Sequence, residues 1–234
     1  MNTDNENSSQ NSNIIYDITT FTHLDYENHL ACIIWFAGCN MRCDYCYNKE
    51  IVFSKNGHYT FEDVLSFLKS RVNLLDAVVL SGGEASSYNL VEFCKKVKGL
   101  GFLIKLDTNG TNFKNIRELI ELQLLDYVAL DYKAPKDKFT KITHSNKYDE
   151  FSKTLDYLIA SPVEFEVRTT LHEDLLDEDD INHIINDLIQ RKYKHTYYIQ
   201  KFLDTKETIG NLQLPIKTLE KEKLSQKLKV IWRF

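Results

Sequence analysis

Several features that assign a protein to a class are scarce in this chain of 234 residues. It has no apolar run near the roughly 18 residues that a membrane-spanning helix needs, and its amino terminus lacks a basic segment followed by an apolar core. With 29 basic against 34 acidic residues its net charge is −5, so no basic surface for nucleic acid is expected. We therefore expect a cytoplasmic protein that binds neither membranes nor nucleic acid.

Cysteine is also scarce, with five residues in all. Cys39, Cys43 and Cys46 are crowded into the stretch GCNMRCDYCYN at 38–48. An odd and crowded set of thiols makes a poor disulfide framework and, in a reducing compartment, is more typical of a metal site. No second cysteine cluster follows, so the sequence has ligands for one metal centre only.

The rest of the chain has an alternating pattern. Residues 1–13 are polar, and we expect a disordered tail there because they cannot bury enough apolar surface to offset the entropy of ordering. Beyond it, short apolar or β-branched runs alternate with segments of helical periodicity, which predicts parallel strands covered by helices. Strands are expected at 31–36, 77–80, 102–106, 127–130, 165–169 and 196–199, and helices at 61–68, 90–98, 116–122, 151–159 and 181–189.

This pattern predicts one α/β domain over 14–213, and 214–234 as a terminal helix or tail packed on it. Six βα units would form an incomplete barrel if the sheet curls, or a doubly wound sheet if it stays open. Periodicity alone does not choose between these two architectures.

The cysteine motif directly follows the first expected strand. Thiolates are soft ligands for zinc, copper(I) or iron–sulfur clusters. A structural zinc site normally has four protein ligands, and with His58 as the fourth the chain would be a zinc-binding interaction module. Cys32 lies in an apolar strand and Cys94 on an apolar helix face, so both are expected in the core. Three cysteines alone would hold a four-iron cluster with one iron open to an exogenous ligand.

Polar elements follow the later strands, at the carboxyl ends where barrel-like βα proteins gather functional groups. In SGGE (81–84) two glycines let backbone approach a ligand closely, and the carboxylate can accept from an ammonium group. DTNG (107–110) has the composition of a turn, and in DYKAP (131–135) an acid and a lysine two apart point the same way on extended chain. Arg168 lies inside an apolar strand, which is costly unless it meets an anion.

The CxxxCxxC spacing, with Tyr45 before the third cysteine and Asn48 after it, resembles the cluster motif of the radical S-adenosylmethionine (SAM) enzymes. The resemblance implies a partial (βα)6 TIM-like barrel in which Cys39, Cys43 and Cys46 hold a [4Fe–4S] cluster. The amino and carboxylate groups of SAM would chelate the open iron, and one electron would cleave the sulfonium to release a 5′-deoxyadenosyl radical.

Within that family, the strand ends look like those of glycyl-radical-enzyme activating proteins over roughly residues 29–202. The likeness implies that Glu84 holds the methionine amino group, with Ala85 where proline is common, and that Arg168 meets the carboxylate. The full implied set of SAM contacts is Tyr45, Gly82, Gly83, Glu84, Asp107, Thr108, Asn109, Lys133, Arg168 and Gln200. Asp107, Thr108 and Asp131 are implied ligands of a monovalent cation. His172 is more often a hydrogen-bonded structural histidine than an acid–base group.

The small size and the DTNG and D-x-K-A-P pair look most like the activating protein of anaerobic ribonucleoside-triphosphate reductase. This implies hydrogen abstraction from a glycine Cα of a partner reductase, with a reducing electron donor such as flavodoxin or ferredoxin. 7-Carboxy-7-deazaguanine synthase, another small member, ranks second because its nearest matches have glutamate in place of Asp107 and lack the D-x-K-A-P run.

Overall fold

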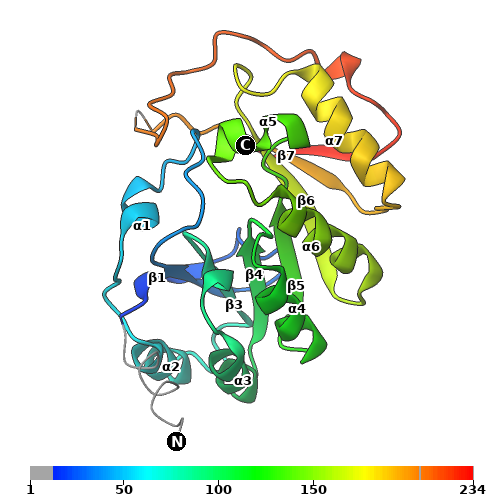
Figure 1. Ribbon diagram of the computed structural model, residues 1–234. Coiled ribbons are helices and arrows are strands. Elements are labelled where there is room, and N and C mark those ends of the chain that lie inside the picture. Colours follow the sequence, from blue (N-terminus) through cyan, green and yellow to red (C-terminus); the bar gives the residue numbers. More distant parts are fainter. Residues whose placement is uncertain (1–12, 206, 234) are drawn as a thin grey trace, which may run out of the picture. The chain divides into compact units, whose positions relative to one another are not determined.

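The computed structural model describes residues 13–205 and 207–233 (Figure 1), so the predicted tail at 1–13 lies outside the described residues except for Asn13. The chain divides into two compact units. Unit 1 contains the chain up to Asn40 together with Glu50–Thr108 and Lys114–Val128, and unit 2 contains Met41–Lys49, Asn109–Phe113 and the chain from Ala129 onward. Residues of the expected core domain at 14–213 thus contribute to both units.

Unit 1 is built on four strands. β1 (Ile15–Thr22) pairs antiparallel with β2 (Ala31–Phe36), and β3 (Ala77–Gly82) and β4 (Leu103–Thr108) continue in parallel. The apolar runs of β2, β3 and β4 are buried almost throughout, as expected for parallel strands covered on both faces. These three strands confirm the predicted ones, whereas β1, which is buried only at its two end residues, was not expected.

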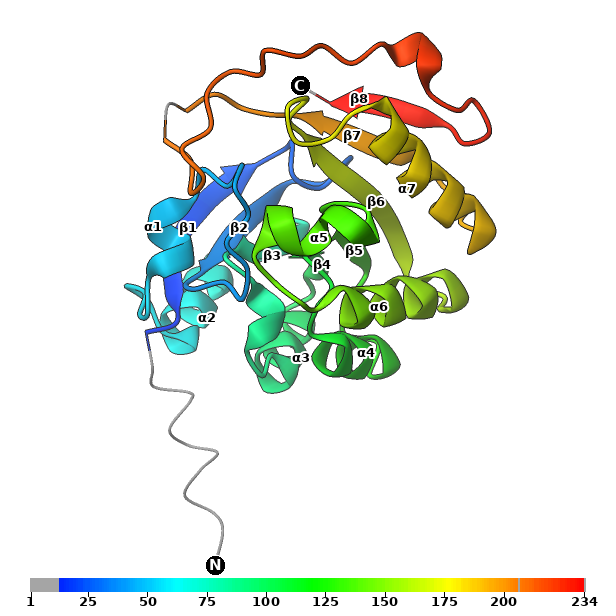
Figure 2. The ribbon, with the colours of Figure 1, turned by 45° about the horizontal axis from the view of Figure 1, so that its top comes forward.

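Helices α1 (Lys49–Phe53), α2 (Phe61–Lys69) and α3 (Val91–Gly99) and the 3₁₀ turn η1 (Ala85–Ser87) lie between these strands in the sequence, and α4 (Phe113–Glu121) follows β4. At the start of α2, Thr60 accepts from the Asp63 amide and the Asp63 carboxylate accepts from the Thr60 amide, which is a capping box. α2 buries one apolar stripe, and Cys94 is fully buried on α3. Both helices can be followed in Figure 2. The predicted helices of this unit are confirmed.

β5 (Tyr127–Asp131) leads from unit 1 into unit 2, where β6 (Glu164–Leu171), β7 (Tyr197–Lys201) and β8 (Val230–Arg233) form a parallel ladder. The helices of unit 2 are α5 (Lys136–Thr143), α6 (Tyr148–Ala160) and α7 (Glu178–Gln190). A second capping box, between Asp177 and Asp180, starts α7, and these acidic side chains complement the positive end of the helix dipole.

The predicted helix over 214–234 is wrong for the described part of that segment. It contains the short 3₁₀ turn η2 (Lys221–Lys223) and strand β8. Its leucines are spaced too irregularly for a helical stripe, whereas Val230 and the following Ile-Trp pair favour a strand. Arg233 anchors β8, because its guanidinium donates to both carboxylate oxygens of Glu166 at 2.8 Å.

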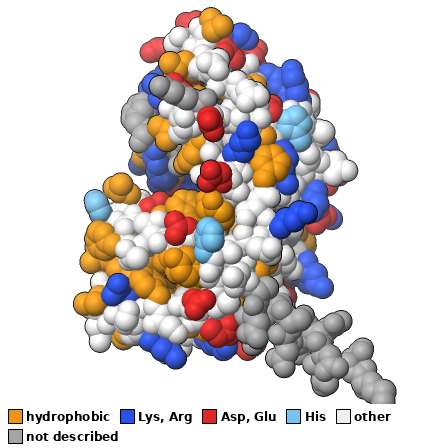
Figure 3. Space-filling view, turned by 90° about the vertical axis from the view of Figure 1, so that its left-hand side faces the viewer, with side chains coloured by type: hydrophobic (Ala, Val, Ile, Leu, Met, Phe, Trp, Pro, Cys, Tyr) orange, Lys and Arg blue, Asp and Glu red, His pale blue; other side chains and the backbone are white. Residues whose placement is uncertain are grey.

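No helix among the described residues combines the length and apolar character needed to cross a membrane. On the face drawn in Figure 3, acidic and basic side chains are interspersed, and hydrophobic side chains gather toward its lower left.

Candidate cofactor site

The start of the cysteine loop lies in unit 1, directly after β2. Gly38 has a φ of +74°, the left-handed conformation that glycine accepts most readily. Its carbonyl accepts from the Glu84 amide at 3.0 Å, and a Cβ on Gly83 would lie only 1.9 Å from the same oxygen. The glycine pair after β3 therefore serves a close approach, as the sequence predicts, but here the approaching group is the protein's own backbone at Gly38.

Glu84 is the buried acid of unit 1, with 2% of its surface exposed. Its Oε1 accepts from Thr108 Oγ1 at 2.7 Å and from Ser86 Oγ at 2.6 Å. At the end of β4, Asp107 accepts from Ser81 Oγ at 3.2 Å. The structure thus brings the Gly-Gly-Glu and Asp-Thr elements together at the carboxyl ends of β3 and β4, and adds Ser86, which sequence reasoning missed because a lone serine after a glycine pair carries no signal.

The second part of the cysteine loop belongs to unit 2, where it lies along the end of α5. The Arg42 amide donates to the Thr143 carbonyl at 2.9 Å and the Asp44 amide to the Ile142 carbonyl at 3.0 Å. Asp44 Oδ1 also lies 2.7 Å from His144 Nε2. The last carbonyls of a helix have no partner inside the helix, and here the loop supplies their donors.

Three charged side chains meet in unit 2, where the end of β5 lies near the middle of β6. Asp131 Oδ1 accepts from Arg168 Nε at 2.5 Å, and its Oδ2 accepts from Lys133 Nζ at 2.9 Å. The bond to Lys133 confirms that the two side chains point the same way. The anion that Arg168 needs inside an apolar strand is a carboxylate of the chain itself.

The ion-paired partners set the protonation of this cluster. Burial alone would raise the pKa of Asp131, but the charges of Arg168 and Lys133 outweigh it and hold that pKa at about 2. Burial would likewise lower the pKa of Lys133, yet the charge of Asp131 raises it well above the usual range. The cluster therefore contains two cations and one anion at neutral pH, which leaves a net positive charge suited to a ligand carboxylate.

Tyr45, just before the third cysteine, lies beside this cluster. Lys133 Nζ is 5.8 Å from the centre of its ring, within the range of a cation–π contact. The tyrosine is 5% exposed, and its hydroxyl is buried without a hydrogen-bond partner. Burial raises the pKa of Tyr45 well above 10, so the hydroxyl keeps its proton. A buried hydroxyl of this kind is costly unless a further group meets it.

Three further predicted residues have contacts of other kinds. Asn109 Oδ1 accepts from the Thr111 amide and hydroxyl, at 3.0 and 2.7 Å, so it shapes its own turn. Gln200 is half-buried on β7, opposite Thr170 and Arg233 in the ladder. His172 is buried with its Nε2 2.8 Å from the Gln213 carbonyl and its Nδ1 accepting from the Asp174 amide, which fits the structural alternative.

None of the five cysteines, all of which lie in the described ranges, forms a disulfide, and they fall into two kinds. Burial raises the pKa of the Cys32 and Cys94 thiols to about 12, so both are protonated core residues rather than thiolate ligands. Within the described ranges 13–205 and 207–233, no group of three or more His, Cys, Asp or Glu side chains is gathered around a metal-ion position. Of the motif cysteines, Cys39 lies in unit 1, and Cys43 and Cys46 lie in unit 2.

The donor chemistry nonetheless fits the implied cofactors. The motif supplies three thiols, which suit iron, and the charged cluster beside Tyr45 suits a carboxylate. His58 is exposed and lies beside β1, with its Nδ1 2.6 Å from the Tyr16 carbonyl.

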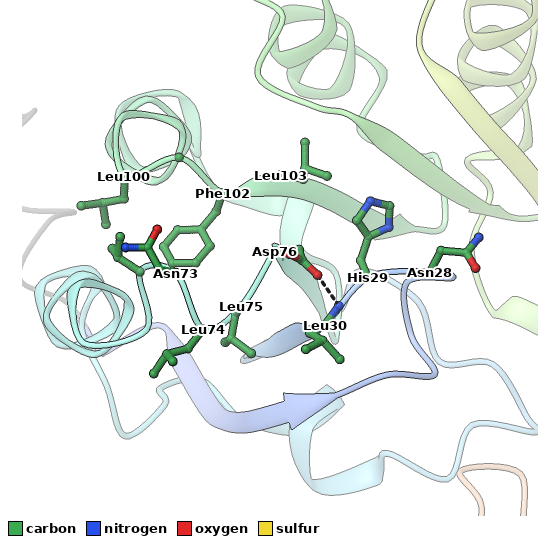
Figure 4. A pocket seen from close by; sticks show the side chains of 12 residues that line it. Asn28, His29, Leu30, Asn73, Leu74, Leu75, Asp76, Leu100, Phe102 and Leu103 are labelled. Carbon is green, nitrogen blue, oxygen red and sulfur yellow. Dashed lines mark hydrogen bonds between the residues drawn. The ribbon is translucent and has the colours of Figure 1, made fainter.

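An open depression of about 680 Å³ lies elsewhere in unit 1, at the amino-terminal ends of β2, β3 and β4 (Figure 4). Leu30, Leu75 and Phe102 contribute much of its lining. Its acid, Asp76, accepts from the Leu30 amide at 2.9 Å, as the dashed line in Figure 4 marks. None of the predicted site residues lines this depression.

The Radical SAM superfamily model matches residues 33–188, and the chain belongs to that superfamily. A protein of Methanocaldococcus jannaschii whose name describes it as a glycyl-radical enzyme activating enzyme is 32% identical over 81% of this chain and 80% of its own length. The pyruvate formate-lyase-activating enzyme of Clostridium pasteurianum is 31% identical over 53% of this chain and 56% of its length.

Solved structures show the same fold. Native anSMEcpe with bound AdoMet has a TM-score of 0.59 at 19% identity, over 72% of this chain and 50% of the other. SuiB of Streptococcus suis bound to the precursor peptide SuiA has a TM-score of 0.61 at 12% identity, over 80% and 42%. The chain thus spans half or less of those proteins. It has the α/β fold of the radical SAM type, a partial TIM-like barrel, which confirms the predicted fold class.

Proposed function

We propose that the chain is a radical SAM enzyme that abstracts a hydrogen atom from a glycine of a glycyl-radical enzyme. Two observations carry the proposal in a chain of this superfamily: the buried Glu84 network at the carboxyl ends of β3 and β4 in unit 1, and the Arg168–Asp131–Lys133 cluster in unit 2. The first offers an acceptor for an ammonium group and the second offers cations for a carboxylate, which are the two charged ends of an amino acid.

In this proposal Cys39, Cys43 and Cys46 hold a [4Fe–4S] cluster. When bound, the cluster would supply the electron that cleaves the sulfonium of SAM to methionine and a 5′-deoxyadenosyl radical, and the glycine hydrogen would convert that radical to 5′-deoxyadenosine. Glu84 accepts from the SAM amino group, and Lys133 and Arg168 meet its carboxylate. Asp131 holds both cations in place. Contacts from Asn109 and Gln200, and a monovalent cation at Asp107, Thr108 and Asp131, stay predictions.

Glycine suits this reaction physically. Loss of its α-hydrogen gives a radical shared between the amide nitrogen and the carbonyl, and there is no side chain to obstruct the approach. The proposed partner is anaerobic ribonucleoside-triphosphate reductase. Pyruvate formate-lyase is a second candidate, because the similar protein of Clostridium pasteurianum is named as its activating enzyme. The proposed electron donor is a flavodoxin or a ferredoxin, and the proposed compartment is the cytoplasm, where thiols stay reduced.

A labelled partner tests the proposal. Each candidate reductase or lyase is produced with α-deuterated glycine and is mixed anaerobically with the reconstituted chain, SAM and reductant. We expect a glycyl radical in the paramagnetic resonance spectrum and deuterium in the 5′-deoxyadenosine. Absence of SAM cleavage contradicts the enzyme class, whereas cleavage without deuterium transfer to either partner contradicts only the choice of partner. 7-Carboxy-7-deazaguanine synthase activity is the next assay in that case.

A further inference from the structure

The cysteine loop of unit 2 is held from two opposite sides. On one side, the amides of Arg42 and Asp44 donate to the end of α5. On the other, the Asp44 carbonyl accepts from the Gly210 amide and the Cys46 carbonyl accepts from the Ile209 amide, both at 2.9 Å. The segment that carries residues 208–211 therefore lies against the loop, and the ribbon shows this C-terminal segment, drawn in orange, beside the loop that precedes α1 (Figures 1 and 2).

Gly210 fits against the loop without spare room. A Cβ at this position would lie 2.6 Å from Asp44 Cβ and 2.9 Å from Asp44 Cα, closer than such atoms approach in proteins. The φ of Gly210 lies outside the left-handed region, so its backbone conformation is open to alanine. The requirement for glycine here comes from contact with the loop alone, and an alanine must displace the backbone of Asp44.

The turn that presents Gly210 is itself fixed. Thr208 is 1% exposed, and its Oγ1 accepts from the Leu212 amide at 2.8 Å. The Asn211 amide donates to the Thr208 carbonyl at 3.1 Å, and Asn211 has a φ of 53°, which asparagine tolerates better than most residues. The four residues thus form a rigid hydrogen-bonded turn.

The turn also restrains the part of the loop that carries Cys43 and Cys46. The carbonyls that it holds belong to Asp44 and Cys46, and the Cys46 amide donates to the Cys43 carbonyl at 3.0 Å. Cys43 is 6% exposed, so its thiol is shielded while the loop keeps this conformation.

We infer that the turn at Thr208–Asn211 is a positioning element that sets the geometry of Cys43 and Cys46 for the bound cluster. The role of these cysteines as ligands rests on the proposed function, whereas the locking of the loop does not. The turn touches the ligand-bearing backbone and not the cofactor, so Gly210 and Thr208 are positioning residues.

The test compares Gly210→Ala with Gly99→Ala, since a Cβ on Gly99 meets no atom within 4 Å. Thr208→Val removes the hydroxyl acceptor and Thr208→Ser keeps it. In the metal-free protein, the rate at which iodoacetamide alkylates Cys43 is followed by peptide mass spectrometry, with the buried Cys94 as an internal standard for global unfolding. In protein reconstituted with iron and sulfide, the iron content and the paramagnetic resonance spectrum of the reduced cluster are measured.

We expect Gly210→Ala and Thr208→Val to speed alkylation of Cys43 at least tenfold with Cys94 unchanged, and to shift the cluster spectrum. Gly99→Ala and Thr208→Ser should match the native protein. Alkylation of Cys43 at the native rate in both Gly210→Ala and Thr208→Val overturns the inference. Alkylation of Cys94 that speeds up as much as that of Cys43 also overturns it, because the variants would then have unfolded as a whole. If native protein holds no cluster while Gly210→Ala exposes Cys43, the locked loop stands and the proposed function fails.

Discussion

Arg168 Nε lies 2.5 Å from Asp131 Oδ1, and the two side chains are only 14% and 19% exposed. The pair joins the end of β5 to the middle of β6, and Lys133 adds a second cation on the other carboxylate oxygen at 2.9 Å. A buried carboxylate with two cationic partners is well compensated, but removing it leaves two charges without their counterion.

Replacement of Asp131 by asparagine keeps the size of the side chain and removes its charge. We expect this variant to lose about 3 kcal/mol of unfolding free energy, because Arg168 and Lys133 stay buried. Urea denaturation of the metal-free protein measures the loss. The control is Asp149→Asn, whose ion pair with Lys136 is 72% and 80% exposed and should contribute less than about 0.5 kcal/mol. Equal losses in the two variants would show that the cluster does not stabilise unit 2.

The Asp131 carboxylate also makes the free energy of unfolding depend on pH. Its pKa is held at about 2, below the ordinary 3.8, so the folded state favours the ionised form. This contribution is therefore fully present above about pH 4 and is lost as the pH falls through about 2, and it amounts to about 2 kcal/mol. Denaturation of the metal-free protein should show that the difference in unfolding free energy between native protein and Asp131→Asn becomes smaller by that amount from pH 5 to pH 2. A difference that does not depend on pH would contradict the lowered pKa of Asp131.

Gly83→Ala should destabilise unit 1, since the new Cβ would lie 1.9 Å from the Gly38 carbonyl oxygen. Overpacking against backbone costs about 1–3 kcal/mol, and we expect the upper end because both groups belong to tight loops. Thermal unfolding compares this variant with Gly99→Ala, which has open space for the new carbon. A melting temperature equal to that of Gly99→Ala would mean that the two loops separate freely.

Removal of the Tyr45 hydroxyl, which has no hydrogen-bond partner, should stabilise the protein, unlike the substitutions above. Tyr45→Phe should stabilise the cofactor-free protein by about 1 kcal/mol, because it removes a buried polar atom that lacks a partner. Tyr132→Phe is the matched control: its hydroxyl bonds Tyr148 and Asp187, both at 3.0 Å, so its loss should cost about 1–2 kcal/mol. Chemical denaturation measures both. If Tyr45→Phe is as destabilising as Tyr132→Phe, the hydroxyl has a partner within the chain.

Glu84→Gln keeps an acceptor for Ser86 and Thr108 and removes only the negative charge. We expect SAM to bind the reconstituted protein at least about tenfold more weakly, since a charge-assisted hydrogen bond contributes about 1.5–3 kcal/mol. Glu92→Gln, at an exposed pair with Lys95, should bind SAM like the native protein. Isothermal titration calorimetry makes the comparison, and equal affinity of the two variants would remove Glu84 from the proposed site.

Much of this fold follows from the sequence, because strands β2 to β7 and the amphipathic helices each have strong periodic patterns. β1 and β8 were missed for a physical reason. β1 is half-exposed, so its apolar residues are few, and β8 has four residues at the end of a polar segment. A strand of that kind is stabilised by pairing with a neighbour and not by its own composition.

Less of the candidate site than of the fold could be predicted from the sequence. The motifs predict which residues carry the chemistry, but not what each side chain touches. Nothing in the sequence shows that Arg168 meets Asp131, because the two are separated by 37 positions. The same holds for Gly210 and Asp44, whose contact depends on how a C-terminal turn folds back on an N-terminal loop.

The central claim is that the three motif cysteines support SAM cleavage. The most direct measurement is mass-spectrometric quantification of 5′-deoxyadenosine formed from SAM by anaerobically reconstituted and chemically reduced protein. The account predicts product from the native chain and from Cys94→Ala, whose thiol lies in the core, and none from Cys43→Ala. Absence of 5′-deoxyadenosine from the native protein, or an equal yield from Cys43→Ala, would contradict it.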